Sequence, residues 1–354
     1  MKKILQIIAG GDPGGGTTHT LQILKNLNLS YSLGLVTQKD SYLLKKSKSI
    51  RNIKCYGLDF MNPLNIFSLA SLRRVCGVFN PDLVHIHGLR AGYFYYFSNV
   101  GLRYIYSVHG YHFLQNNIIA FNLKRCLERK IALCANYVIL VSLADKRIAT
   151  KYNLLPMGRN YSVVYYGMKI YTLKKASAIS RNIAFIGRLV KQKDPLFFLD
   201  VVEKLPGYKV TVVGGGELEE KTRTESKRRG LNINFTGFLS HEEVLKVLPK
   251  FSAIVMTSRW EGLPIMAIES MLSGVPLVAI NVGGLNEIIQ NNHSGLLVES
   301  RSPADVASAI RRLDNDRKLR VKIILNAKKH IKMQFSEDKM IRKIYKIYNR
   351  CLYS

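Results

Sequence analysis

The sequence predicts an α/β protein with two doubly wound parallel sheets. Short apolar runs recur along the chain and alternate with stretches of helical period, which is typical of strands joined by crossover helices. The 354 residues are enough for two domains, each with a core of its own. We therefore expect two Rossmann-like domains that face each other across a cleft, where ligands of such sheets bind.

The predicted strands fall into two sets. The first half holds apolar runs at residues 4–10, 33–38, 82–88, 104–110 and 137–142, and the second half holds them at residues 182–188, 208–216, 233–238, 252–258, 276–280 and 295–299. Residues 165–180 have no clear period and are interpreted as the connection between domains. We expect an N-terminal domain over residues 1–168, a C-terminal domain over 181–335, and a last helix over 336–354 that packs back on the N-terminal domain.

The charge of the chain indicates an anionic partner. The sequence holds 53 Lys and Arg against 24 Asp and Glu, a net charge of +29, and residues 1–170 are the more one-sided part with 22 against 6. The basic residues are scattered in pairs and are not interleaved with aromatic residues, which disfavours a nucleic-acid surface. Phosphorylated small molecules and an anionic membrane face remain as the expected partners.

Cysteine usage and hydropathy indicate a cytoplasmic protein. The five cysteines form no CxxC pair and leave an odd one over, which suits a reducing compartment and offers no zinc site. The longest apolar run, residues 131–141, is shorter than the roughly 18 to 20 residues that cross a bilayer. No small-residue cleavage site follows the apolar N-terminus, so we expect no secretory signal.

A glycine-rich loop, GGDPGGGTT at residues 10–18, joins the first predicted strand to a helical pattern. A Walker loop would need lysine where Gly16 stands, and a dinucleotide loop would need glycines where Asp12 and Pro13 stand. Glycines still allow a close backbone approach, and free N–H groups at a helix start favour an anion. A phosphate-binding loop and a tight turn without a ligand both remain open.

Residues 257–288 hold two carboxylates around a predicted helix. Pro264 suits the first helical position, and Gly274 suits the residue just past the end of the helix. Glu261 precedes this helix and Glu269 lies within it, so their carboxylates can accept hydrogen bonds from sugar or ribose hydroxyls while the helix start faces a phosphate. This spacing fits a sugar nucleotide; the alternative is an acidic residue at a helix start and a solvated glutamate.

The second half resembles the glycosyltransferases of family 4, which are retaining enzymes of the two-domain GT-B architecture. The resemblance rests on E-x7-E from Glu261 to Glu269, on ESMLSGVPLVA and GGLNE around and after it, and on IAFIGRLVKQKDP and VVGGGE before it. It implies that Arg188 and Lys193 clamp the donor diphosphate and that Glu269 holds the ribose. It further implies that Glu261 and the backbone after it hold the transferred sugar and its phosphate, through Leu263, Pro264 and Ile265.

The resemblance implies further positions in both halves. Gly237, Phe238 and Leu239 would line the pocket for the nucleobase. His241 to Glu243 are expected to begin the next helix. Gly15 and Gly16 would contact the donor phosphates, with Arg188 and Lys193 supplying the cations that the loop lacks. His109 would lie at the sugar ring near the reacting carbon, although a histidine at a strand end is equally a core residue.

Three other histidines, His85, His87 and His112, are interpreted as structural or acceptor-lining, because no carboxylate pairs with them at metal-ligand spacing. Glu-Gly-Leu-Pro from Glu261 replaces the Glu-Gly-Phe-Gly usual in the family, which bears on donor specificity. Tyr166-Gly167 stands where Asn-Gly is common. No Asp-x-Asp lies between apolar residues, so we expect neither a metal ion nor a cofactor.

The resemblance, together with these observations, predicts a retaining, metal-independent hexosyltransferase. Its donor would be a UDP- or GDP-sugar and its acceptor a glycan or a polyprenyl-diphosphate-linked oligosaccharide held by the N-terminal domain. The sugar would enter a bacterial surface polysaccharide such as an O-antigen, capsule or exopolysaccharide. The protein would lie peripherally on the inner face of the cell membrane, and the aromatic residues Tyr93 to Phe97 are either an interfacial contact or the buried face of a helix.

Two alternatives remain. A sugar-nucleotide epimerase would share the architecture and release no transferred product. A nucleic-acid-binding protein would explain the charge, but carboxylates such as Glu261 and Glu269 that face a groove repel phosphates.

Overall fold

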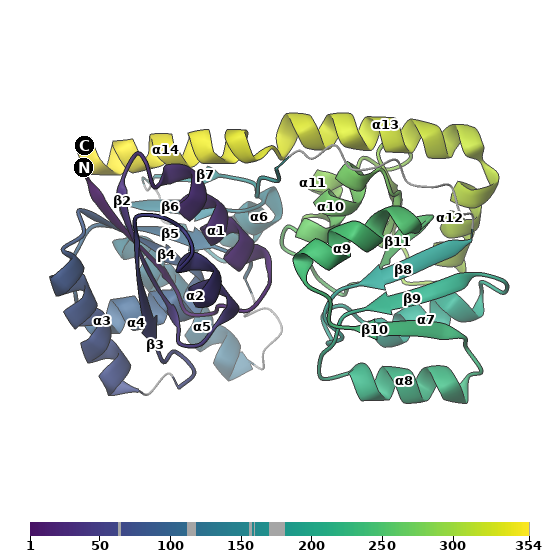
Figure 1. The fold of residues 1–354 in the computed structure, drawn as a ribbon, viewed down its shortest axis with the longest axis horizontal. Helices are drawn as coiled ribbons and strands as arrows, with labels where there is room; N and C mark the ends of the chain where they lie inside the picture. The colour runs from purple at the N-terminus through teal and green to yellow at the C-terminus, as the bar shows by residue number, and fades with distance from the viewer. Residues whose placement is uncertain (63–64, 112–117, 156–157, 159, 170–180, 354) are drawn as a thin grey trace. The chain divides into compact units, whose positions relative to one another are not determined.

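The computed structural model describes residues 1–62, 65–111, 118–155, 158, 160–169 and 181–353. His112 and most of the expected connection between domains lie outside the described residues. The chain divides into two compact units, here called the first unit (Met1–Gly167 with Glu337–Ser354) and the second unit (Met168–Ser336). Each unit is built on its own sheet (Figure 1).

The first unit contains a seven-stranded sheet in the order β3-β2-β1-β4-β5-β6-β7, and every pairing is parallel. Its strands are β1 (Lys3–Ile8), β2 (Ser32–Gln38), β3 (Ile53–Leu58), β4 (Leu83–His87), β5 (Tyr104–Val108), β6 (Tyr137–Leu140) and β7 (Tyr161–Val163). The sequence did not predict β3 or β7. Both are edge strands whose residues are mostly half-buried or exposed, so neither has the continuous apolar run of a central strand.

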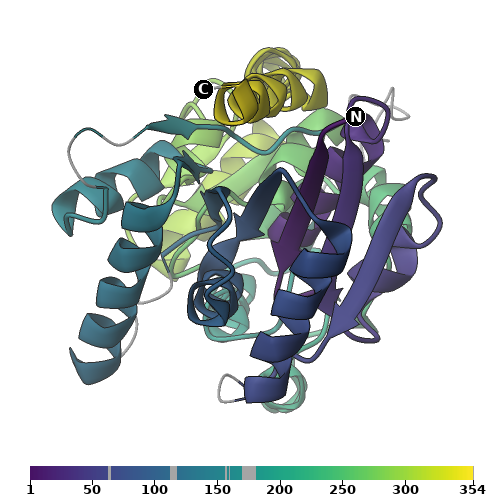
Figure 2. The ribbon, with the colours of Figure 1, turned by 90° about the vertical axis from the view of Figure 1, so that its left-hand side faces the viewer.

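Helices cover both faces of this sheet. The helices of the first unit are α1 (Gly15–Leu27), α2 (Tyr42–Ser47), α3 (Ile66–Phe79), α4 (Gly88–Ser98), α5 (Ile118–Cys134), α6 (Leu143–Lys151) and α14 (Glu337–Tyr353). One core lies between the sheet and α3, α4 and α5, and Figure 2 shows these three helices. The opposite core lies under α1 and α14, to which α14 contributes Met340, Ile344, Ile347 and Cys351 at helical spacing.

The second unit contains a six-stranded parallel sheet in the order β10-β9-β8-β11-β12-β13. Its strands are β8 (Asn182–Ile186), β9 (Lys209–Val213), β10 (Ile233–Gly237), β11 (Ala253–Met256), β12 (Leu277–Ile280) and β13 (Leu296–Val298). Its helices are α7 (Pro195–Glu203), α8 (Glu219–Arg228), α9 (His241–Val247), α10 (Ile265–Ser273), α11 (Leu285–Ile288), α12 (Pro303–Asn315) and α13 (Arg317–Gln334), with the short 3-10 helix η2 (Leu248–Lys250). The prediction of two Rossmann-like parallel sheets is confirmed.

The start of α10 corrects one detail of the sequence analysis. Pro264 is not the first helical residue: it is the N-cap, with an extended ψ of 116°, and the helix begins at Ile265. An N-cap residue stands in the extended region, and proline loses nothing there because its position needs no donor. Gly274 ends the helix with a φ of 75°, as predicted.

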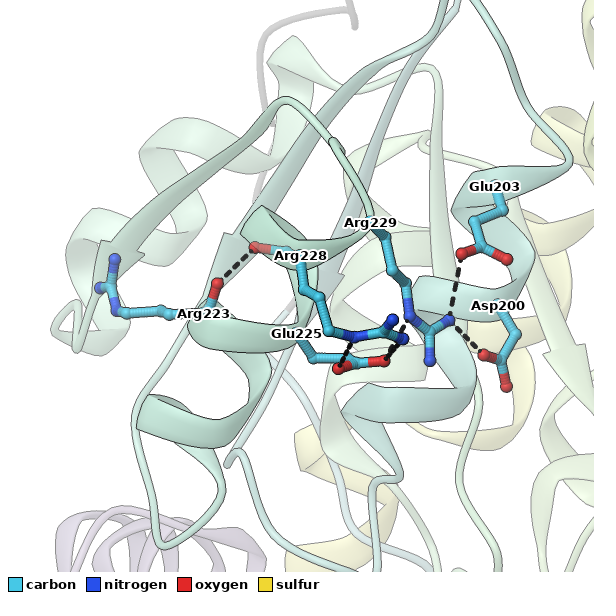
Figure 3. Close-up of polar contacts among 7 residues, drawn as sticks. Asp200, Glu203, Arg223, Glu225, Arg228 and Arg229 are labelled. Atoms are coloured by element: carbon cyan, nitrogen blue, oxygen red, sulfur yellow. Dashed lines mark hydrogen bonds and ion pairs between the residues drawn. The ribbon is translucent and has the colours of Figure 1, made fainter.

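Helix α8 is attached to the second unit mainly through charged side chains. Its buried residues are the polar Thr222 and Ser226. Just past its end, Arg229 lies 2.6 Å from Asp200 of α7 and 2.7 Å from Glu225 (Figure 3). Arg223 of α8 stacks on the ring of Phe235 at 4.6 Å.

A buried carboxyl lies in the core beneath α5. Glu128 of this helix is 3% exposed and accepts a hydrogen bond of 2.6 Å from the hydroxyl of Tyr106 on β5. Burial raises the pKa of Glu128 from 4.5 to about 8. The side chain is therefore protonated in the folded protein at neutral pH.

This burial predicts that the first unit loses stability as the pH rises from 4.5 to about 8. In that range Glu128 is protonated when folded and ionised when unfolded, so unfolding releases a proton and is favoured by alkali. Glu128→Gln should raise the midpoint temperature of unfolding at pH 8. The difference between the midpoint temperatures at pH 4.5 and pH 8 should therefore be smaller than in the wild type. Thermal unfolding followed at both pH values measures this.

Glu220→Gln, at an exposed position of α8, is the matched control and should leave the pH dependence unchanged. A pH dependence of Glu128→Gln equal to that of the wild type would contradict the assignment.

Candidate functional site

The candidate donor site of the second unit is built on close contacts between loops at the carboxyl ends of its strands. A Cβ on Gly214, after β9, would lie 2.0 Å from the carbonyl oxygen of Gly187, after β8. A Cβ on Gly283 would lie 1.8 Å from the carbonyl oxygen of Glu261. Both glycines also have positive φ, so no other residue fits without moving the loops that carry Arg188 and Glu261.

Two of the predicted residues form a buried ion pair. The Nζ of Lys193 lies 2.5 Å from Oε1 of Glu261, and the hydroxyl of Ser258 donates to the same oxygen at 2.5 Å. The side chain of Glu261 is 4% exposed and that of Lys193 is 19% exposed. The pair thus presents one cation and one carboxylate side by side, with much of the surrounding water excluded.

Arg188 lies on the same loop as Lys193 but is exposed to solvent. Its guanidinium stands 3.5 Å from the side-chain oxygen of Gln192, at the outer limit of a hydrogen bond. Its fork of donors is therefore only weakly engaged and suits a bidentate anion.

Glu269 is the other carboxylate predicted on this segment, and it lies inside α10 with 4% of its side chain exposed. It accepts a hydrogen bond of 2.6 Å from Nε2 of His241, the first residue of α9. This hydrogen bond raises the pKa of His241 above its usual 6.5. The sequence predicted that His241 begins a helix, which is confirmed, but gave no sign of its contact with Glu269.

The residues predicted around the base and the sugar phosphate stand at the ends of neighbouring elements. Gly237 ends β10 with a φ of 70°, Phe238 is 69% exposed, and Leu239 is half-buried. Leu263 and Pro264 are buried and Ile265 is half-buried at the start of α10, which has no side-chain cap.

Four residues that the sequence analysis missed hold these loops together. The buried carboxylate of Asp194 lies 2.6 Å from Arg301 and 2.8 Å from Arg259. The hydroxyl of Thr257 donates to the backbone carbonyls of Lys193 and Asp194, at 3.0 and 3.1 Å. Asp194 adopts a left-handed φ of 52° directly before Pro195, and the proline is the local sequence signal of a turn there. Arg301 stands 107 residues away in the sequence, and no residue pattern indicates its contact with Asp194.

In the first unit the glycine loop, His109 and Tyr166 come together. Helix α1 begins after Gly14, which provides no side-chain cap. A Cβ on Gly15 would lie 3.0 Å from the ring of Tyr166, and one on Gly16 would lie 3.6 Å from the ring of His109. The hydroxyl of Tyr166 is 2.6 Å from Nδ1 of His109, and the two rings stack.

His85 and His87 are buried on β4 beneath this loop. Burial lowers the pKa of His85 to about 3 and that of His87 well below its usual range. Within the described residues no group of three or more His, Cys, Asp or Glu is arranged to hold a metal ion.

The two parallel Rossmann-like sheets are those of the GT-B fold class. Residues 174–330 match the model of the glycosyl transferases group 1, and residues 13–168 match that of glycosyltransferase family 4. The chain therefore belongs to the group 1 glycosyltransferases of family 4 type, and the resemblance found in the sequence is confirmed.

Similar proteins include two relatives in sequence and one solved structure. An uncharacterized glycosyltransferase of Methanocaldococcus jannaschii is 32% identical over 165 residues, which is 46% of this chain and 46% of that protein. The chain thus spans about half the length of this relative. An Escherichia coli UDP-Gal:α-D-GlcNAc-diphosphoundecaprenol α-1,3-galactosyltransferase is 25% identical over 79% of this chain and 78% of its own. Anabaena HepE, solved with UDP-glucose, shares the fold with a TM-score of 0.85 and 19% identity, over 99% of this chain and 100% of its own.

The contact between His241 and Glu269 predicts a measurable titration. The pKa of His241 should lie above 6.5, and the stability from this pair should be complete below 6.5 and lost as the pH rises through the folded value. In Glu269→Gln the pKa should fall, because the hydrogen bond to a carboxylate is gone. NMR titration of the imidazole signals measures both values.

Glu242→Gln is the matched control, since it removes a neighbouring charge and keeps the hydrogen bond. It should lower the pKa of His241 by less than Glu269→Gln does. An unaltered His241 titration in Glu269→Gln would exclude the contact in solution.

Proposed function

We propose that this glycosyltransferase is a retaining enzyme that takes its sugar from a nucleoside diphosphate donor. The observation that carries the proposal is the buried pair of Lys193 and Glu261 beside the exposed guanidinium of Arg188. Two cations suit a diphosphate, whose charge grows as it leaves, and a buried carboxylate suits the hydroxyls of the transferred sugar.

The proposed donor contacts follow from this arrangement. Arg188 and Lys193 stabilise the leaving diphosphate, and the uncapped start of α10 at Ile265 donates backbone N–H groups to it. Glu269 accepts from the ribose hydroxyls, with His241 beside it. The base lies against Gly237, Phe238 and Leu239. From the first unit, Gly15 and Gly16 would approach the phosphates and His109 would lie near the reacting carbon.

We propose that the acceptor attacks on the face from which the diphosphate departs. The carboxylate of Glu261 is engaged by Lys193 and Ser258 and is thus poorly placed to act as a covalent nucleophile. In the proposed step the acceptor oxygen forms a bond to the anomeric carbon, the bond from that carbon to the phosphate oxygen breaks, and the phosphate oxygen takes the acceptor proton. Arg188 and Lys193 supply the positive charge, so the reaction needs no bound metal ion.

We propose a polyprenyl-diphosphate-linked glycan as the acceptor and a bacterial surface polysaccharide as the product. The name of the Escherichia coli relative states an acceptor of this kind and a UDP-linked donor, and the Anabaena structure holds UDP-glucose. Both observations favour UDP over GDP. The excess of Lys and Arg in residues 1–170 suits an acceptor that carries a diphosphate.

A screen of UDP- and GDP-sugars, read as nucleotide release that requires a polyprenyl-diphosphate acceptor, tests the function. We expect Arg188→Ala and Glu261→Ala to lower turnover by about 10² or more, the scale for removal of a group that stabilises a transition state. Chelation of divalent ions should leave the rate nearly unchanged.

Arg317→Ala, at an exposed position of α13, is the matched control and should retain full activity. Conversion of the donor sugar without an acceptor would identify the epimerase instead. Full activity of folded Arg188→Ala and Glu261→Ala would refute the site.

We further propose that the first unit binds the inner face of the membrane through α3, α4 and α5. These helices pack side by side on one face of the sheet (Figure 2). Within the described residues no helix is both long and apolar enough to cross a bilayer. Large apolar side chains of the three helices are nevertheless exposed, at Ile66, Phe67, Val78, Tyr96, Phe97, Ile119 and Leu123. Exposed cations accompany them, at Arg73, Arg74, Arg90, Arg125, Arg129 and Lys130.

The sequence left open whether the aromatic residues of α4 form an interfacial contact or the buried face of the helix, and some of them fit each interpretation. Phe94 and Tyr95 are buried in the core, whereas Phe97 is 50% exposed and Tyr96 is 37% exposed. The interfacial contact we propose therefore uses the outer residues of α4 together with Phe67 of α3 and Ile119 of α5.

Sedimentation with vesicles tests this surface. Each cation near an anionic surface contributes roughly 1 kcal/mol, and the attraction fades over about 10 Å at moderate salt. We expect binding to phosphatidylglycerol vesicles that is lost at high salt and weakened by Phe67→Ser with Ile119→Ser. Leu325→Ser, which changes an exposed residue of α13, is the matched control. Equal behaviour toward neutral and anionic vesicles would remove the membrane proposal.

A further inference from the structure

A chain of six hydrogen bonds runs through the interior of the first unit, from Tyr166 to Ser107. It joins the hydroxyl of Tyr166 to Nδ1 of His109 (2.6 Å), and Nε2 of His109 to Nδ1 of His87 (3.0 Å). Nε2 of His87 is 2.8 Å from the amide oxygen of Gln6, whose amide nitrogen is 2.8 Å from the hydroxyl of Tyr348. That hydroxyl is 2.7 Å from Nδ1 of His85, and Nε2 of His85 is 2.7 Å from the hydroxyl of Ser107.

The hydrogen-bond chain links residues that are distant in the sequence. Gln6 stands on β1, His87 on β4 and Tyr348 on α14, and the side chains of Gln6 and Tyr348 are separated by 342 positions in the chain. Gln6, His85 and Tyr348 have no exposed surface, and His87 is 3% exposed. Water therefore does not compete for these hydrogen bonds.

Burial also keeps His85 and His87 neutral, because it lowers the pKa of each ring. A neutral imidazole has one N–H, so one of its nitrogens donates and the other accepts. Once the donor of one link is known, the donors of the links on either side follow.

The amide of Gln6 sets the direction. Its nitrogen donates to Tyr348, so its oxygen accepts from Nε2 of His87. Nδ1 of His87 then carries no hydrogen and accepts from Nε2 of His109. When the ring of His109 is neutral, its Nδ1 carries no hydrogen and accepts from the hydroxyl of Tyr166. On the other side, Tyr348 donates to His85, and His85 donates to Ser107.

We propose that Gln6, His87 and Tyr348 are positioning residues that hold His109 as a neutral ring with its hydrogen on Nε2. The catalytic consequence rests on the proposed function, in which His109 lies near the reacting carbon. Positive charge develops on the sugar ring in a glycosyl transition state, so an imidazolium beside it would raise the barrier. Through Tyr348, the C-terminal helix α14 thereby contributes one positioning residue to the proposed site.

The tautomers can be observed without any substrate. In protein labelled with ¹⁵N-histidine, two-bond proton–nitrogen correlations distinguish a ring with hydrogen on Nε2 from one with hydrogen on Nδ1. We expect the Nε2–H form for His85, His87 and His109. The Nδ1–H form at His87 and His109 would mean that the chain runs in reverse, and would overturn the proposal.

Tyr348→Phe tests the positioning by removal of one oxygen. It leaves the amide nitrogen of Gln6 and Nδ1 of His85 without this partner, so the Gln6 amide is free to turn. We expect mixed tautomers at His87 and His109 and a fall in kcat of about tenfold, the scale for loss of a ring-orienting partner, with little change in KM. Tyr353→Phe removes the same oxygen from a residue of α14 that is 72% exposed, and should leave both readouts unchanged.

The two readouts separate this proposal from the proposed function. Unchanged tautomers in Tyr348→Phe, or altered tautomers with an unchanged kcat, would overturn the positioning role even if Arg188→Ala and Glu261→Ala behave as expected. If those two variants retain activity, the donor site is wrong, while the tautomers of the unliganded protein still report on the chain. The wild-type spectrum decides the direction even if Tyr348→Phe does not fold.

Discussion

The proposed donor site depends on one buried carboxylate that is shared by two arginines. Asp194 binds Arg301 and Arg259 and follows directly on Lys193, while Arg301 also donates to the carbonyl of Ser258, three residues before Glu261. A buried carboxylate is costly unless it is paired, so this contact fixes both loops at once. The short distance between Lys193 and Glu261 follows from that constraint, since neither loop can move without exposing or unpairing Asp194.

The two units have similar sheets but differ in the charge of the polar side chains near their strands. In the second unit charged side chains stand in loops after the strands, as Lys193 and Glu261 do, or within a helix, as Glu269 does, and each is matched by a partner within hydrogen-bonding distance. In the first unit the corresponding interior holds neutral rings and an amide, because His85 and His87 are too deeply buried to carry charge. Such a polar core, when every link is matched, permits few alternative arrangements of β1, β4 and α14.

Local patterns in the sequence predicted the strands and helix ends that a few neighbouring residues specify. The central strands, the start of α9 at His241 and the end of α10 at Gly274 were all predicted, because an apolar run or a turn residue specifies each. The edge strands β3 and β7 lack that pattern. Contacts made by packing also have no sequence signal: Arg301 reaches Asp194 across 107 positions, and Tyr348 reaches Gln6 across 342. The family resemblance suggested the proposed site residues but not the neighbours that hold them.

Helix α14 has a consequence for how the protein is made. It completes the core of the first unit with Met340, Ile344 and Ile347, yet it follows the whole second unit in the chain. During synthesis from the N-terminus, the sheet of the first unit leaves the ribosome with that face covered by α1 but not yet by α14, so the core around Ile4, Leu33 and Ile105 is completed only later. The second unit can fold before α14 is synthesised, so the first unit is the later of the two to be completed.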